Sequence, residues 1–231
     1  MFKINHNSYK ARVHYKFLIY LTAFYVITLI ITAVTFHRLV LLGSLVEPGG
    51  ILVFPLMYFF GDAIAEIYGQ PVAKQVIWSA LCADLFFSLS TKFIVSLSAP
   101  IYWHDQDAYN TVFNPLLHLF FISSISMTVS ALINVSVLTR WKTLVHGKYF
   151  ILRSIGSSAI GEAVLSLISI PLIFHNQLSV VESLELTLNI YLWKLMYSLI
   201  IAIPGGLLVR ILKIFENIQF QRMDEAPLKG G

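Results

Sequence analysis

The chain has 231 residues, of which 57% are hydrophobic and only 12% are charged. This composition is typical of an integral membrane protein and excludes an ordinary water-soluble domain. The net charge of +4 does not indicate nucleic acid binding, because the basic residues flank apolar runs instead of covering one face of a module. With Cys82 as its single cysteine, the chain forms no intramolecular disulfide and no cysteine metal cluster.

Six apolar stretches are long enough to cross a bilayer as helices, since a hydrocarbon core about 30 Å thick needs roughly 20 helical residues. The first is too long for a secretory signal and lacks a small-residue cleavage site after it, so we expect an uncleaved span. The predicted spans cover residues 17–40, 50–67, 73–98, 116–138, 153–174 and 187–210.

This pattern predicts an all-α integral membrane protein. A single six-helix domain is expected over residues 1–216, and a polar, disordered tail over residues 217–231. The lipid bilayer is then the first partner of the chain.

The loops between the spans predict the orientation, because cytoplasmic loops of membrane proteins carry an excess of Lys and Arg. Thirteen of the 16 basic residues fall on one side if the N-terminus is cytoplasmic: Lys3, Lys10, Arg12, Lys16, Lys74, Arg140, Lys142, Lys148, Arg153, Arg210, Lys213, Arg222 and Lys229. We therefore expect a multi-pass protein of a bacterial cytoplasmic (inner) membrane with both termini inside.

The approach to the second span contains Gly49 and Gly50, with Pro55 shortly after. Two structures fit this pattern. One is a turn followed by a helix kinked by proline, and the other is a re-entrant or broken helix whose N-terminus points at a ligand.

Five ionisable residues lie near the middle of the predicted spans. Asp62 and Glu66 are four residues apart, so their carboxyl groups project from one helical face. Charged groups at that depth are costly and face a bundle interior or a water-filled cavity, which makes them candidates for a binding site or for proton transfer. Asp84, Glu162 and Lys194 lie on three other spans, and pairing Lys194 with one or more acids would stabilise it.

Other side chains near these acids extend the candidate site. Phe54 and Tyr58 belong to an aromatic group that could stack on a planar ring. Ser158 lies in a strip of small residues that either leads to Glu162 or lets two helices approach closely. A purely structural polar network remains the alternative for the whole set.

Sequence motifs of enzymes are absent. The chain has no HExxH, no GxSxG and no His or Cys cluster with metal-ligand spacing, so neither catalysis nor a metal or other cofactor is expected. A phosphate-binding loop is absent as well, and use of ATP would therefore need a separate energising module.

Residues spread over most of the chain resemble the queuosine precursor transporter family, also called the putative vitamin uptake family. The resemblance begins in the second span and its neighbour, and it continues in the fifth and sixth spans. It rests on Phe54, Pro55, Asp62, Glu66, Tyr68, Gly69, Lys74, Trp78, Arg153, Ser157, Ser158, Gly161, Tyr191, Lys194 and Pro204.

This resemblance implies a six-helix carrier related to the substrate-binding components of energy-coupling vitamin transporters. The implied cargo is a 7-deazaguanine base, a precursor of the queuosine modification of transfer RNA. Such a base offers two adjacent N–H donors that one carboxylate can accept in parallel, and its planar ring can stack on an aromatic face. The predicted substrate-binding residues are Asp62, Glu66, Glu162, Lys194, Phe54, Tyr58 and Ser158.

One position departs from the family pattern. Where the family has Asp in the fifth span, this chain has Leu165, and its acid, Glu162, lies three residues earlier on nearly the same face. Glu162 either replaces the missing Asp or marks a paralogous carrier for another small planar metabolite.

Several further alternatives remain open from the sequence. They are a binding component that depends on an energising module, an intramembrane enzyme, and a structural membrane subunit. Proton-coupled uptake and a homo-oligomer are both compatible with the sequence.

Overall fold

The computed structural model describes residues 15–36, 38–42, 45–174 and 179–216. Six helical segments in this part of the chain are long and apolar enough to cross a membrane, which confirms the predicted all-α architecture. The helices are α1 (Leu18–Thr35), α2 (Pro55–Tyr68), α3 (Gln70–Ser96), α4 (Gln106–Leu144), α5 (Phe150–Phe174) and α6 (Val180–Phe215). The predicted tail over residues 217–231 lies outside the described residues.

The ends of three helices differ from the prediction. The α4 and α6 helices, Gln106–Leu144 and Val180–Phe215, continue well beyond the predicted spans 116–138 and 187–210. Hydropathy detects only the apolar part of a helix, whereas backbone hydrogen bonding continues into its polar turns. The α1 helix ends at Thr35, so the predicted first span was too long at its C-terminal end.

A short β-hairpin follows α1, and the sequence prediction missed it. Strand β1 (Leu39–Leu42) pairs antiparallel with β2 (Leu45–Pro48), and Leu39 lies opposite Pro48. Strands of four residues carry too little periodicity to be told from the end of an apolar helix.

The second span consists of a 3₁₀ turn, η1 (Gly49–Leu52), followed by α2. Pro55 is the first residue of α2, where its missing N–H costs nothing, so it begins the helix instead of kinking it. Gly50 packs against α1 so closely that a Cβ there would lie 2.6 Å from the Thr32 carbonyl oxygen. Only glycine permits this approach.

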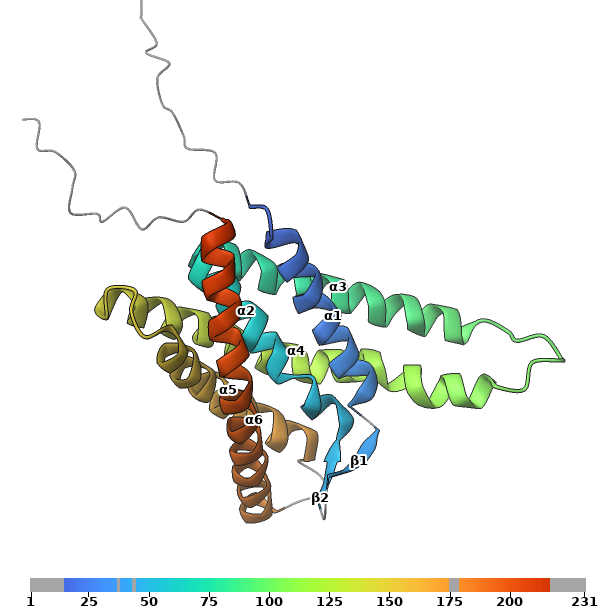
Figure 1. Ribbon diagram of the computed structural model, residues 1–231. Helices are drawn as coiled ribbons and strands as arrows, with labels where there is room; N and C mark the ends of the chain where they lie inside the picture. The colour runs from blue at the N-terminus through green and yellow to red at the C-terminus, as the bar shows by residue number, and fades with distance from the viewer. Residues whose placement is uncertain (1–14, 37, 43–44, 175–178, 217–231) are drawn as a thin grey trace, which may run out of the picture.

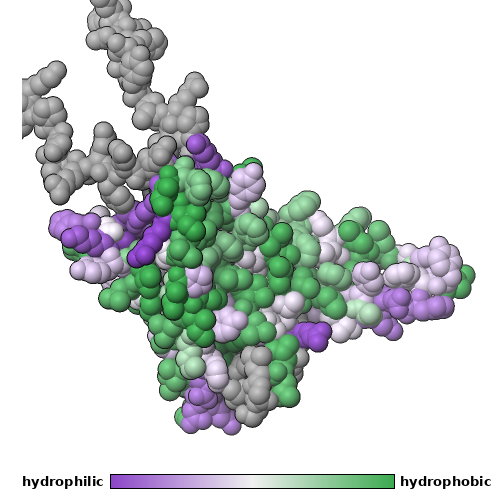
Figure 2. Space-filling view, in the orientation of Figure 1, coloured by the Kyte–Doolittle hydropathy of each residue, from purple (hydrophilic) through white to green (hydrophobic). Residues whose placement is uncertain are grey.

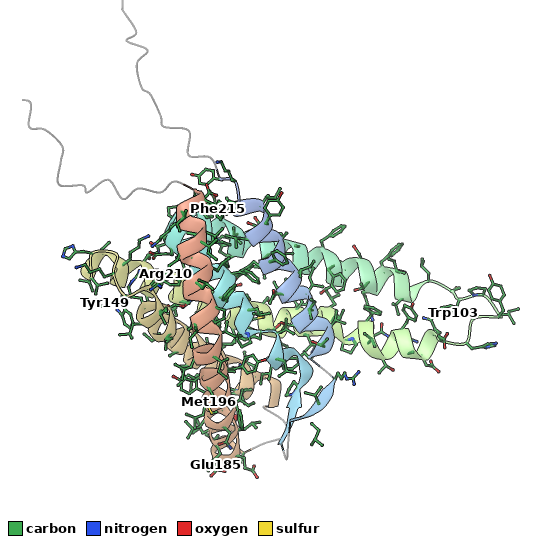
Figure 3. The ribbon with its side chains drawn as sticks, in the orientation of Figure 1. Trp103, Tyr149, Glu185, Met196, Arg210 and Phe215 are labelled. Carbon is green, nitrogen blue, oxygen red and sulfur yellow. The ribbon has the colours of Figure 1, made fainter. Side chains whose placement is uncertain are left out.

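The helices converge at one end and diverge at the other. In Figure 1 the α3–α4 pair extends to the right while the α5–α6 pair extends downward, and α1 and α2 lie between them. We call these pairs the two arms. Figure 3 shows Trp103 at the tip of the α3–α4 arm and Glu185 near the tip of the α5–α6 arm, whereas Tyr149, Arg210 and Phe215 lie toward the opposite end.

The surface agrees with a protein that spans a membrane. Figure 2 shows hydrophobic residues along the sides of the helices and hydrophilic residues gathered at their ends and turns. Large apolar side chains such as Phe86, Phe93 and Ile200 are exposed on the outer faces of the helices. Such faces are stable against lipid.

Candidate functional site

A cavity of about 100 Å³ lies where the two arms separate. Its lining comes from the C-terminal half of α1, from η1 and from α3, α4, α5 and α6. The wall is mostly apolar, and its polar members include Asp84, Ser123, Ser169 and Lys194. A cavity of this size holds several water molecules or part of a small ligand.

Phe54 and Lys194, two of the predicted site residues, line this cavity. The Lys194 Nζ atom lies 5.2 Å from the centroid of the Phe54 ring, within the range of a cation–π interaction. Lys194 also donates a hydrogen bond to Ser166 Oγ at 3.5 Å. The structure thus places a cation and an aromatic face beside each other on the cavity wall.

Asp62 lies deeper in the bundle, where its carboxylate joins three helices. Asn134 of α4 donates to its Oδ1 at 2.7 Å, and two serines of α5 donate to its Oδ2. These are Ser154 and Ser158, the latter at 3.5 Å. Asp62 is 1% exposed, so its acceptor capacity is used within the protein.

Glu66 lies one turn further along α2 and binds three cations. Its Oε2 is 3.0 Å from Arg153 Nη2 and 3.5 Å from Lys142 Nζ, and its Oε1 is 2.6 Å from Lys213 Nζ. We call these four residues the Glu66 cluster. It connects α2 to α4, α5 and α6 at the end where the helices converge.

The sequence prediction missed the Glu66 cluster. It expected Lys194 to pair with one or more of the intramembrane acids. Lys194 attracts Glu162 electrostatically, whereas Glu66 is paired with Lys142, Arg153 and Lys213. Lys142 and Lys213 were assigned to loops, and Arg153 was placed at the first position of the fifth span, because all three lie at the edges of apolar runs. Long basic side chains can extend back along a helix to a buried acid. Basic residues at the edges of the apolar runs were therefore the sequence feature that could have predicted the cluster.

The remaining predicted residues surround the cavity without forming its wall. Tyr58 shares a hydrogen bond with Ser130 and packs edge-on against Phe54, with ring centroids 5.4 Å apart. Glu162 is fully buried, and within the described part of the chain neither of its carboxylate oxygens has a hydrogen-bond partner. Ser166, the partner of Lys194, lies one helical turn after Glu162, so both project from one face of α5.

Two further cavity residues bear on specificity. Leu165, the residue that departs from the family pattern, lines the cavity and is 5% exposed. Asp84, which the sequence analysis noted but did not include in the site, also lines it.

Six helices of spanning length around a cavity define a multi-pass membrane protein. A protein-family model described as putative vitamin uptake transporter matches residues 48–209, and the chain belongs to that family. The match runs from the end of β2 into α6 and so includes all the residues of the Glu66 cluster except Lys213. Neither the curated proteins nor the solved structures gave a match to this chain.

Proposed function

We propose that this protein is a membrane carrier that imports a queuosine precursor for transfer RNA modification. The proposed cargo is a 7-deazaguanine base such as 7-cyano- or 7-aminomethyl-7-deazaguanine. The observation that carries the proposal is the cavity between the arms, where the Phe54 ring and the Lys194 ammonium line one wall in a member of a vitamin uptake transporter family. A planar base can stack on the ring while its carbonyl oxygen accepts a hydrogen bond from the amine.

The charge distribution supports an orientation for this carrier. Lys142, Arg153 and Lys213 gather where the helices converge, and we propose that this end faces the cytoplasm of a bacterial inner membrane. The cavity lies toward the divergent end, since its lining includes Thr32, Phe36 and Pro48. The described conformation then corresponds to a carrier that receives substrate from outside.

Direct substrate contact by Asp62, Glu66, Glu162, Tyr58 and Ser158 stays a prediction. For Asp62 and Glu66 such contact requires the substrate to replace donors that the protein already supplies, namely Asn134 and the serines in one case and three cations in the other. For Glu162 it requires no such exchange, because its oxygens accept no hydrogen bond among the described residues.

Uptake coupled to protons is part of the proposal, because a buried carboxylate near a lysine can exchange a proton during transport. Proteoliposomes that contain the purified protein should then show substrate-dependent alkalinisation of the external medium. Measurable uptake of 7-cyano-7-deazaguanine without this signal contradicts the coupling. Binding without uptake favours a component that needs an energising module.

The central test is rescue of queuosine in transfer RNA in a bacterium that lacks both precursor synthesis and its own importer. Cells that express the wild-type chain should restore the modification at low external precursor. Glu162→Ala should fail despite normal membrane levels, and Glu66→Ala should fail with reduced levels if the Glu66 cluster is lost. Well-expressed wild-type protein that restores nothing would overturn the proposed cargo.

A further inference from the structure

Two charged residues from different arms line the same cavity. Asp84 belongs to α3 and Lys194 to α6, and these helices extend in different directions in Figure 1. Both side chains are at least nine-tenths buried, with 6% of Asp84 and 9% of Lys194 exposed. Asp84 Oδ1 has no hydrogen-bond partner among the residues that the structure describes.

A buried carboxylate oxygen to which no described residue donates a hydrogen bond is costly, because its burial is not compensated by the protein. Proteins retain such groups where a ligand supplies the missing donor. The location of Asp84 fits that explanation, since Asp84 lines the cavity between the arms and also a neighbouring cavity of about 20 Å³.

We propose that Asp84 and Lys194 are the two charged contacts of the substrate site. This assignment rests on the proposed function and adds a residue that neither the sequence analysis nor the family match assigns. The Asp84 carboxylate accepts the two adjacent N–H donors on the edge of a guanine-like base, and the Lys194 amine donates to the carbonyl oxygen beside them. The ring of the base lies among the apolar residues of the wall, with Phe54 beside Lys194.

The other acids are less suited to this role. Asp62 already accepts from Asn134 and two serines, and displacing them would leave those buried donors unpaired. Glu66 is held by three cations at the convergent end. Glu162 accepts no hydrogen bond among the described residues, but it is 0% exposed, does not belong to the cavity lining and is attracted electrostatically by Lys194.

The position of Leu165 strengthens the assignment. An Asp at this place on α5 would put a carboxylate on the cavity wall, whereas leucine makes that part of the wall apolar. Asp84 is then the acidic residue of the cavity wall that can accept hydrogen bonds from a ligand with several N–H donors. Because its partner Lys194 is on the other arm, a base that contacts both residues connects the arms.

The test uses the purified full-length protein and equilibrium binding of tritiated 7-cyano-7-deazaguanine. Competition with unlabelled 7-cyano-7-deazahypoxanthine, which lacks the 2-amino group, measures how much the N–H donor of that group contributes to the binding affinity. The variants are Asp84→Asn and Lys194→Met, and Asp107→Asn serves as the matched control because Asp107 is exposed on α4. Thermal unfolding of each variant without ligand reports the fold.

Wild-type protein should prefer the guanine-like base by at least 10-fold, and Asp84→Asn should weaken its binding by roughly 10- to 100-fold, as expected when hydrogen bonds to a charged group are lost. In the Asp84→Asn variant, removing the 2-amino group from the ligand should cost little additional affinity. The preference of this variant for the guanine-like base over the 2-deamino analogue should therefore be smaller than that of the wild type. Lys194→Met should weaken both ligands, while Asp107→Asn should change neither.

The outcomes separate this inference from the proposed function. A folded Asp84→Asn protein that keeps both the affinity and the preference overturns the Asp84 assignment and leaves the carrier function standing. Wild-type protein that binds neither base overturns both the proposed cargo and the assignment of Asp84 and Lys194 as its binding site. If Asp84→Asn does not fold, the smaller and uncharged Asp84→Ser variant takes its place with the same expectation.

Discussion

The convergent end of the molecule and the cavity between the arms treat buried charge in opposite ways. At the convergent end both carboxylate oxygens of Glu66 are paired, and three helices meet α2 through them. Around the cavity, Asp84 Oδ1 and both oxygens of Glu162 have no hydrogen bond among the described residues. Ion-paired, hydrogen-bonded charge fixes the helices relative to one another, whereas a buried carboxylate without hydrogen bonds lowers stability and is available to a ligand or a proton.

The largest expected effect comes from removing the charge at the convergent end. Glu66→Gln keeps the shape of the side chain but leaves Lys142, Arg153 and Lys213 without their anion. Loss of one partner from a buried ion pair typically costs about 3–5 kcal/mol, and Arg153 is only 3% exposed. We expect a fall of this size in the free energy of unfolding, measured by SDS-induced unfolding in detergent micelles.

Glu185→Gln is the control for this variant, because Glu185 is exposed near the tip of the α5–α6 arm (Figure 3). It should unfold like the wild type. Wild-type stability of Glu66→Gln combined with a selective loss of substrate binding would make Glu66 a substrate ligand instead of a structural anchor.

A smaller loss is expected from disturbing the packing at the same end. A Cβ at Gly156 would clash with the Trp141 ring, so α4 and α5 approach closely there because the side chain is missing. Gly156→Ala forces the ring or the helix to move and should cost about 1–3 kcal/mol of unfolding free energy. Adding Trp141→Leu should recover part of that loss, and absence of recovery would show that contact with the ring is not its cause.

The two regions also differ in what the sequence could predict about them. Apolar length predicted six helices, because crossing a bilayer requires a minimum length whatever the packing. The same criterion could not place Lys142 and Lys213 beside Glu66, since both lie outside the predicted spans on helices that continue further than their apolar parts. The partner of a buried acid depends on how long basic side chains extend along the helix surface.

The cavity was harder to predict than the charges themselves. Phe54 and Lys194 were recognised as candidates, and the structure puts both on the cavity wall. Asp84 was noted as an intramembrane acid, but which side of α3 faces the cavity depends on the packing of α3 against α4 and on the angle between the arms. Hydropathy gives neither the rotation of a helix nor that angle.

The smallest effect on stability is expected from Glu162→Gln, and comparing it with Glu66→Gln tests the difference between the two regions directly. Glu162→Gln removes a carboxylate that accepts no hydrogen bond within the described residues. The folded state then loses no hydrogen bond, only the electrostatic attraction to Lys194, and is relieved of a buried charge. We expect the free energy of unfolding to stay within about 1 kcal/mol of the wild type or to rise, unlike the loss after the same substitution at Glu66. Uptake of 7-cyano-7-deazaguanine into proteoliposomes should fall at the same protein level. A loss of stability as large as that of Glu66→Gln would instead show that Glu162 is bound within the resting protein, and the cavity would then have to work through Asp84 and Lys194 without it.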